Sequence, residues 1–235
     1  MINLSERSYK KELLDDPSIP FADIQQNMKE LNTINTYLGG HDISIAGLKK
    51  ILENKLQKNS ITICEIGCGG GDNLKAIDNW CKRNSIDVKF IGIDIKAECI
   101  EFARQQYPEL KAEWMVADYK LINFQQQKPG IIFSSLFCHH FINEPLITMM
   151  QWMKKNAAQG FFINDLHRHV LAWYSIRMIT AFFSKSYLVK NDAPLSVARG
   201  FTKKEWVKIM TASGIKDYSI QWKWAFRHLI VYHND

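Results

Sequence analysis

The sequence contains no apolar run that approaches the roughly 20 residues needed to cross a bilayer. Its first six residues, MINLSE, lack the basic region and the apolar stretch of a secretory signal. The five cysteines are an odd number and show no metal-ligand pairing, so we expect reduced thiols. These absences predict a chain without a membrane span that works in the cytoplasm.

Long runs of basic residues are also absent. The net charge is +6, but the basic residues are scattered and their longest runs are pairs such as Lys49-Lys50 and Lys154-Lys155. Proteins that bind nucleic acid concentrate positive charge in runs or patches. Solvated lysines on helices therefore explain the charge better than an RNA-binding track does, and nucleic acid is disfavoured as a partner.

The chain does contain enough apolar sequence for a large core. Hydrophobic residues make up 46% of the 235 positions and aromatic residues 12%, which excludes a disordered chain and favours a single core. Residues 1–59 have amphipathic helical spacing, with helices that end before Pro17, run from Phe21 to Tyr37 and run from Ile45 to Leu56. We expect this segment to cap the domain that residues 60–235 form.

Strands and helices alternate after this segment. The predicted strands are 61–66, 88–94, 112–117, 130–136 and 159–164, and the predicted helices between them are 72–83, 97–107 and 144–156. Such alternation is typical of a parallel sheet with helices on both faces. A helix at 202–213 and two directly successive strands at 216–223 and 225–232 close the chain, and the two strands predict an antiparallel hairpin.

The loop after the first strand is rich in glycine and reads EIGCGGGD from Glu65 to Asp72. Glycines let the backbone turn sharply and let a ligand lie against it. A strand, a glycine loop and a helix in this order are typical of a nucleotide-like cofactor site. Glu65 would repel a pyrophosphate but would suit an ammonium group, which disfavours a dinucleotide. A dinucleotide site and a turn that binds nothing remain as alternatives.

The E-x-G-x-G-x-G string from Glu65 resembles the first motif of class I S-adenosylmethionine (SAM) methyltransferases. Asp94 ends the second strand, where an acid can accept hydrogen bonds from ribose hydroxyls, although it would do so for NAD as well. WMVADY, which ends at Tyr119, resembles the acidic loop of this family that contacts adenine, and Ser134 to His140 resembles the end of its fourth strand. The resemblance implies SAM as cofactor, bound by Glu65, Gly67, Gly69, Asp94, Ile95, Asp118, Tyr119 and Ser134.

The resemblance covers about residues 60–235. It implies the Rossmann-like α/β fold of class I methyltransferases, with strand order 3-2-1-4-5-7-6, strand seven antiparallel, N-terminal helices and a helical insert after strand five. NDLHR at 164–168 and DAPLSVAR at 192–199 look like a subset of small-molecule methyltransferases of quinone and polyketide pathways.

The insert at 165–201 follows the fifth predicted strand, at the sheet edge where substrates bind. It is rich in His, Arg and aromatic residues. We expect it to form a substrate lid with the N-terminal helices. The predicted substrate residues are Arg168, His169, Trp173, Arg177 and Arg199. Another set of residues in the insert is expected to pack on the core as the apolar face of a helix: Leu171, Tyr174, Met178 and Phe182.

Histidine suits general-base catalysis because its ordinary pKa is about 6.5. The candidate bases are His139, His140 and His167, with His169 as a further candidate. A metal site is not expected, because adjacent histidines rarely converge on one ion and no Cys pair is present. Residues 134–137 read SSLF instead of the Asn/Asp-Pro-Pro-aromatic string of base N-methyltransferases, which favours O- or C-methylation.

The sequence therefore predicts a SAM-dependent methyltransferase that acts on an oxygen or carbon of a small aromatic, quinone or polyketide-like acceptor. The expected assembly is a monomer or a homodimer. One alternative is an RNA-directed methyltransferase, motivated by the net charge of +6. The other is a methyltransferase-like binding protein without catalysis, which the intact glycines disfavour.

Overall fold

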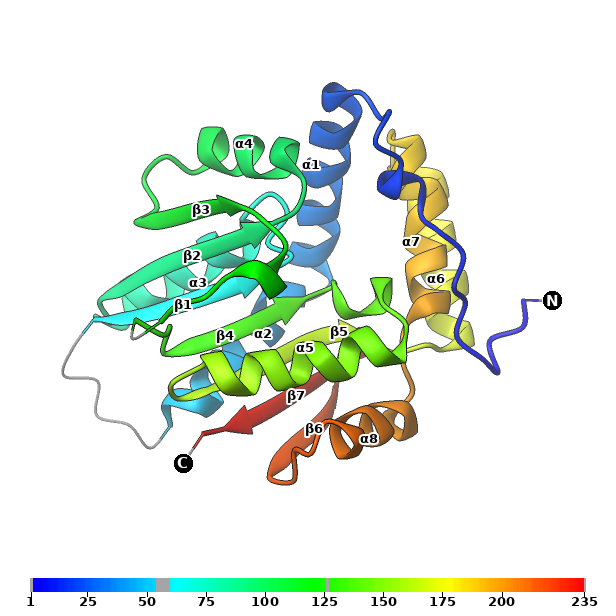
Figure 1. The fold of residues 1–235 in the computed structure, drawn as a ribbon. Helices are drawn as coiled ribbons and strands as arrows, with labels where there is room; N and C mark the ends of the chain where they lie inside the picture. The colour runs from blue at the N-terminus through cyan, green and yellow to red at the C-terminus, as the bar shows by residue number, and fades with distance from the viewer. Residues whose placement is uncertain (1, 54–59, 126, 235) are drawn as a thin grey trace.

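A seven-stranded sheet forms the centre of the protein (Figure 1). The computed structural model describes residues 2–53, 60–125 and 127–234. The strands are β1 (Ile61–Ile66), β2 (Val88–Asp94), β3 (Ala112–Val116), β4 (Ile131–Ser135), β5 (Gly160–Leu166), β6 (Tyr218–Lys223) and β7 (Arg227–His233). Their order is β3-β2-β1-β4-β5-β7-β6, which confirms the predicted topology.

Strand direction also agrees with the prediction. The first five strands pair in parallel, while β7 is antiparallel to both β5 and β6. The carboxyl ends of β1, β2, β4 and β5 therefore meet at one edge of the sheet. In an open parallel sheet, ligands bind at this edge.

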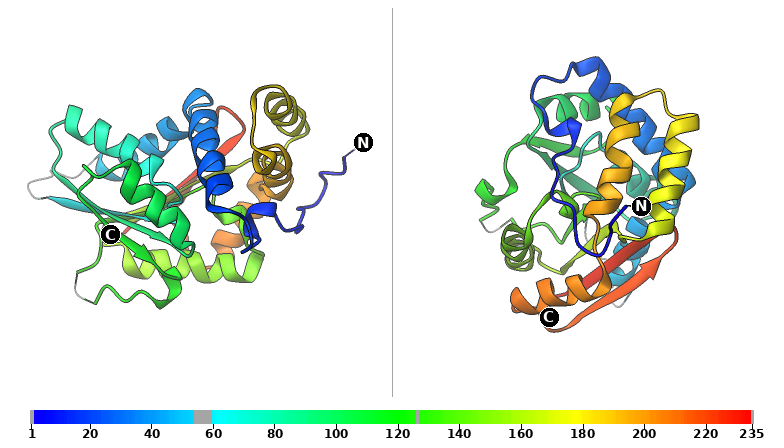
Figure 2. Two further views of the ribbon diagram at one scale, coloured as in Figure 1. Left: turned by 90° about the horizontal axis from the view of Figure 1, so that it is seen from above. Right: turned by 90° about the vertical axis from the view of Figure 1, so that its right-hand side faces the viewer.

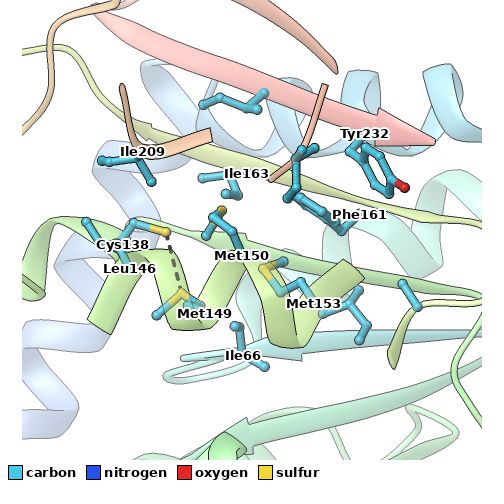
Figure 3. Packing of buried hydrophobic residues seen from close by; sticks show 14 of the residues in the cluster. Ile66, Cys138, Leu146, Met149, Met150, Met153, Phe161, Ile163, Ile209 and Tyr232 are labelled. Atoms are coloured by element: carbon cyan, nitrogen blue, oxygen red, sulfur yellow. Dashed lines mark hydrogen bonds between the residues drawn. The ribbon is translucent and has the colours of Figure 1, made fainter. Parts of the chain in front are cut away.

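Helices cover both faces of the sheet (Figure 2). On one face lie α2 (Gly40–Leu52) and α3 (Asp72–Arg83), and on the other lie α5 (Asn143–Asn156) and α8 (Lys203–Ala212). The helix α4 (Ala97–Gln106) packs on β2 and β3. The core between α5 and the sheet is rich in sulfur, because Met149, Met150 and Met153 of α5 pack in one cluster with Phe161 and Ile163 of β5 (Figure 3). Such flexible side chains fit irregular gaps in a core.

Three further helices stand beyond the carboxyl edge of the strands, on one side of the molecule (Figures 1 and 2). They are α1 (Phe21–Tyr37), α6 (Val170–Phe183) and α7 (Tyr187–Arg199). The N-terminal arm, residues 2–20, runs along α7 and is bound to it through Asp192, which accepts the backbone N–H groups of Leu13 at 2.8 Å and Leu14 at 3.0 Å. The Glu30 carboxylate of α1 accepts the N–H of Ser186 at 3.1 Å.

Two predictions for the N-terminal helices were wrong. The segment before Pro17 contains only the short 3-10 helix η1 (Leu13–Asp15) among the described residues. The third helix begins at Gly40 instead of Ile45, because Gly39 adopts a left-handed conformation (φ 71°) and starts α2 directly after α1. Its predicted end at 54–56 lies outside the described residues. A capping box of Thr202 and Glu205 starts α8, and the helix follows it where the sequence predicted one.

The predicted core packing of α6 was wrong. Leu171, Tyr174, Met178 and Phe182 are exposed, with exposed fractions of 61%, 42%, 60% and 78%. The face that packs inward carries Ala172, Ile176 and Thr180 instead. The helix is apolar on nearly all sides, so the spacing of its apolar residues could not identify the buried face.

An ion pair between a buried arginine and a partly exposed glutamate connects the insert to α8 and the N-terminal arm. The two Nη atoms of Arg168 lie 2.9 Å from the two carboxylate oxygens of Glu205, and its Nε donates to the carbonyl of Leu4 at 2.9 Å. The Arg168 side chain is 1% exposed. Removing one partner of such a pair leaves the other charge poorly solvated.

Arg168→Ala is therefore expected to destabilise the fold by about 3 kcal/mol, a fall of roughly 6–12 °C in Tm for a chain of this size. Arg177→Ala is the matched control, because Arg177 is exposed and lies over the Trp173 ring at 5.0 Å. Calorimetric unfolding of both variants measures the effect. Equal Tm values for the two variants would contradict this role of Arg168.

Candidate functional site

A cavity of about 680 Å³ lies between the carboxyl edge of the sheet and the three outer helices. One end is bounded by the glycine loop after β1 and the ends of β2 and β3. The other end is bounded by α1, α6, α7 and the turn between β6 and β7. We refer to the first end as the loop end and to the second end as the chamber. The chamber wall is mainly apolar and includes Leu31, Ile34, Leu38, Leu166, Ile176, Ile179, Val197 and Phe226.

The glycine loop is shaped by packing at two of its positions. A Cβ on Gly67 would lie 2.3 Å from the Phe137 ring, and a Cβ on Gly71 would lie 2.6 Å from the Trp114 ring. At Gly69 the nearest atom would be 3.5 Å away, and the N–H of this residue donates to Asp94 Oδ2 at 2.9 Å. All three residues have positive φ, which favours glycine. Gly67 and Gly69 line the cavity, as predicted for a cofactor loop.

Glu65 is a buried acid at the loop end of the cavity. It is 1% exposed, and its Oε2 has no hydrogen-bond partner among the described residues. Burial raises the pKa of Glu65 well above its ordinary value, and the carboxylates of Asp72 and Asp94 raise it further. A buried carboxylate with a free oxygen at a cavity wall is suited to a positively charged ligand group.

The other predicted cofactor residues also lie at the loop end, with one exception. Asp94, Ile95, Asp118 and Tyr119 line the cavity. Burial raises the pKa of Asp94, although backbone N–H groups of Lys96 and Gly69 bind its carboxylate and oppose this shift.

Ser134 is the exception. It is buried, with its Oγ 3.8 Å from Cys138 Sγ, and its neighbour Ser135 lines the cavity in its place. Successive side chains of a strand point to opposite faces, so an error of one residue changes the predicted face.

A histidine–aspartate pair lies between the two ends of the cavity. His139 belongs to the 3-10 helix η3 (Cys138–His140) after β4, and Asp165 belongs to β5. His139 Nδ1 lies 2.8 Å from Asp165 Oδ1, and both residues are buried. Burial alone would raise the pKa of Asp165, but the charge and hydrogen bond of His139 outweigh it and lower this pKa. An ionised Asp165 accepts the Nδ1 proton and leaves His139 Nε2 as the free nitrogen.

The N-terminal arm brings a second carboxylate to this pair. Glu12 Oε1 lies 3.7 Å from His139 Nε2, and Glu12 Oε2 lies 3.8 Å from His140 Nε2. Burial raises the pKa of Glu12 and lowers the pKa of His140 well below its ordinary value, so His140 is neutral. Glu12 was not predicted as a site residue, because no motif in the arm indicates where it folds back. Asp165 is part of the NDLHR string, but no role was predicted for it.

Glu12, His139 and His140 have the composition of a metal site. Their donor atoms all lie within 4.8 Å of one another. Adjacent histidines rarely converge on one ion, but here Glu12 completes a set of three donors with them. However, Ser196 Oγ already donates to Glu12 at 2.7 Å, and Arg199 Nε lies 3.9 Å from Glu12 Oε1. A guanidinium so close to the ligand atoms disfavours a divalent cation.

We therefore retain the prediction that activity needs no metal. Treatment with EDTA followed by gel filtration is expected to leave turnover within about twofold of the untreated enzyme, since Arg199 supplies the positive charge next to Glu12. Turnover and metal content by mass spectrometry are measured on the same samples. A loss of activity that Zn²⁺ or Mg²⁺ restores would identify the three residues as ligands.

The predicted base His167 and three predicted substrate residues are not among the described residues that line the cavity. His167 Nδ1 accepts a hydrogen bond from Trp222 Nε1 at 3.2 Å. His169 caps α6 and stacks on Phe226 at 5.1 Å. Trp173 contacts Tyr174 and Arg177 on the surface of the same helix. These contacts stabilise the insert.

Arg168 and Arg199 also contact other parts of the chain instead of the cavity. The Arg199 guanidinium donates to the carbonyl of His139 at 3.1 Å and to that of His140 at 2.8 Å. Both arginines hold elements in place by binding backbone carbonyls. Arg199 thereby fixes the turn that carries both histidines.

Residues 63–160 match the family model described as "Methyltransferase domain". The chain carries a methyltransferase domain. The matched segment begins in β1 and ends in β5, so it contains the glycine loop, Asp94 and both histidines of η3. The recognition of a methyltransferase and the assignment to this class of enzyme are thus confirmed. A comparison with curated protein sequences finds no match.

Solved structures confirm the class I fold of this methyltransferase domain. The plantazolicin methyltransferase BpumL, solved with SAH, has a TM-score of 0.67 and 18% identity and covers 94% of this chain and 92% of its own. Magnesium protoporphyrin IX methyltransferase (ChlM) from Synechocystis PCC 6803, solved with SAM, has a TM-score of 0.57 and 11% identity. The match covers 87% of this chain and 84% of ChlM. Human N-acetylserotonin methyltransferase, also solved with SAM, has a TM-score of 0.62 and 12% identity. The match covers 90% of this chain and 56% of the human protein.

Proposed function

We propose that this enzyme transfers a methyl group from SAM to an oxygen or carbon of a small, largely apolar acceptor with a phenolic or enolic hydroxyl. The observation that carries the proposal is the buried His139–Asp165 pair, which lies where the glycine-loop end of the cavity meets an apolar chamber. The structural similarity to methyltransferases that are named for the small molecules they act on supports this acceptor class.

SAM is the methyl donor, and when bound it supplies a methyl group activated by a positively charged sulfur. The loop end fits this cofactor. Glu65, with its unpaired buried oxygen, would bind the ammonium group, and Asp94 at the end of β2 would bind the ribose. Asp118 and Tyr119 would contact the adenine. A Cβ on Gly69 would make only ordinary contact with Met28 Sδ at 3.5 Å, so the missing side chain would let the cofactor approach the backbone.

His139 is the proposed general base. Asp165 fixes the imidazole so that Nε2 is the atom that can take a proton, and Nε2 faces Glu12 at the cavity wall. A positioned base that removes the acceptor proton contributes about 10²–10⁴-fold to the rate. His140 is neutral and less buried, and we assign it to the orientation of the acceptor.

The remaining contribution comes from positioning and from exclusion of water. The apolar chamber would hold the acceptor in line with the methyl group, and such alignment can supply about 7–11 kcal/mol of the barrier. The N-terminal arm, α1, α6 and α7 close the chamber together, so we propose that residues 2–37 and the insert at 165–201 act as one lid. Residues 60–235 supply the fold that binds SAM.

The two alternative functions are less well supported. An RNA-directed enzyme needs a basic, open groove for its substrate, whereas the chamber wall here is apolar. A binding protein without catalysis has no use for a buried His–Asp pair at the cavity wall. Retention on RNA at physiological salt would favour the first alternative, and lack of SAM binding would favour the second.

The proposal is tested by incubation with labelled SAM and a panel of alkylated phenols, quinones and pyrones, with product detection by mass spectrometry. We expect the label on a hydroxyl oxygen or on the adjacent ring carbon, and faster turnover for acceptors that carry an apolar chain. Transfer to none of these acceptors, combined with transfer to RNA or protein, would refute it.

A further inference from the structure

The outer face of α6 is a broad apolar surface. Val170, Leu171, Tyr174, Met178 and Phe182 are between 42% and 78% exposed, and Phe183 at the end of the helix is 83% exposed. The first five of these side chains lie within one arc of the helix, and α6 forms an outer side of the molecule (Figure 2). A monomeric protein that stays in water rarely exposes so many large apolar side chains together. We call this surface the α6 face.

The opposite side of the same helix belongs to the acceptor chamber. Ala172, Ile176 and Ile179 line the cavity. Ser175 also lines it and is exposed, so the cavity reaches the surface beside the α6 face. Trp224, which is 68% exposed, marks another point where the chamber wall is open to the surface. A molecule that covers the α6 face would therefore lie next to an opening of the chamber.

The segment that carries this face has charges of a single sign, although Glu30 and Asp23 of α1 bind Ser186 and Tyr187 at its far end. Residues 166–191 contain no Asp or Glu, but they contain Arg168, Arg177, Lys185 and Lys190. Arg168 is paired with Glu205, whereas Arg177, Lys185 and Lys190 are exposed. Aromatic and aliphatic side chains flanked by Lys and Arg are typical of helices that lie in the interface of a membrane. Anionic lipid headgroups attract such positive charges.

From this arrangement we propose that the α6 face docks on an anionic membrane surface. Phe182, Met178 and Leu171 enter the boundary between headgroups and acyl chains, while Arg177 and Lys185 bind the lipid phosphates. Docking places the chamber opening at the lipid surface. On the basis of the proposed function, this is the route by which an amphiphilic acceptor would enter from the bilayer.

Charge favours the membrane over a second copy of this chain as the occupant. In an interface made by two α6 faces, residues 166–191 of the second copy would supply no acidic partner for Arg177 or Lys185. Like charges in close contact reduce affinity. An anionic bilayer supplies both the apolar layer and the opposite charge.

The test is sedimentation of the full chain with vesicles of phosphatidylcholine alone or with phosphatidylglycerol, without SAM or acceptor. We expect binding to anionic vesicles, at least tenfold weaker binding to neutral ones, and about fivefold weaker binding for each of Arg177→Gln and Lys185→Gln. Met178→Glu with Phe182→Glu should abolish binding. The control Val207→Glu changes an exposed apolar residue of α8 and should bind as the wild type does.

Failure of the wild type to bind anionic vesicles, or normal binding by the doubly substituted variant with an unchanged Tm, would overturn the proposal. A dimer in light scattering that the same variant dissociates would assign the face to a second copy and also overturn it. Because vesicle binding is measured without methyl transfer, its failure is distinct from failure of the proposed function.

Discussion

His139→Ala is expected to lower kcat by about 10²–10⁴-fold at saturating SAM and acceptor, the range that a positioned general base contributes. Asp165→Asn should have a similar effect, because an asparagine cannot keep the imidazole in the tautomer that leaves Nε2 free. His139 Nδ1 and Asp165 Oδ1 are 2.8 Å apart, so each residue depends on the other. Turnover by mass spectrometry and SAM affinity by calorimetry are measured for both variants.

His167→Ala is the matched control, since His167 is not among the residues that line the cavity. SAM affinity should stay within about threefold in all three variants, because a group that acts in the transition state changes the rate and not cofactor binding. The rate of His139→Ala should rise with pH until the acceptor hydroxyl ionises without help. Near-normal rates for His139→Ala across pH 6–9 would rule out general-base catalysis by this residue.

Glu65→Gln is expected to weaken SAM binding by at least 30-fold. Loss of one partner of a buried, hydrogen-bonded charge pair costs about 2–5 kcal/mol, and Gln retains the shape of Glu without the charge. The substitution should leave Tm unchanged or raise it, because Glu65 is buried with an unpaired oxygen in the free protein. Weaker binding together with a lower Tm would indicate a structural role for Glu65.

The raised pKa of Glu65 predicts a dependence on pH with a defined sign. Between the ordinary pKa of 4.5 and the raised pKa in the fold, the folded protein holds a proton that the unfolded chain has lost. The stability of the free enzyme therefore falls as the pH rises through this window. The affinity for SAM rises through the same window, because an ammonium group selects the ionised carboxylate. Calorimetry in buffers of different ionisation enthalpy should detect proton release on binding, which Glu65→Gln removes.

The sequence predicted the features that depend on residues close together in the chain. Glycine spacing and the acid at the end of β2 are local patterns, and the alternation of strands and helices restricts the order of the sheet. Features that depend on contacts between distant segments were missed. Glu12 meets His139 only because the arm folds along α7, where Ser196 binds it across 184 positions of sequence. The exposed side of α6 was misassigned because both sides of that helix are apolar.

The binding of the N-terminal arm to α7 has a consequence for the order in which the protein folds. Leu13 binds Asp192 across 179 positions, whereas Gly69 binds Asp94 across 25. Contacts between distant residues form late, because they require closure of long loops. The loop end of the cavity therefore takes shape early, from a short stretch of chain. The chamber is completed only when the N-terminal arm meets α7. A chain that ends before α7 would therefore lack the acceptor site while still containing the residues of the loop end.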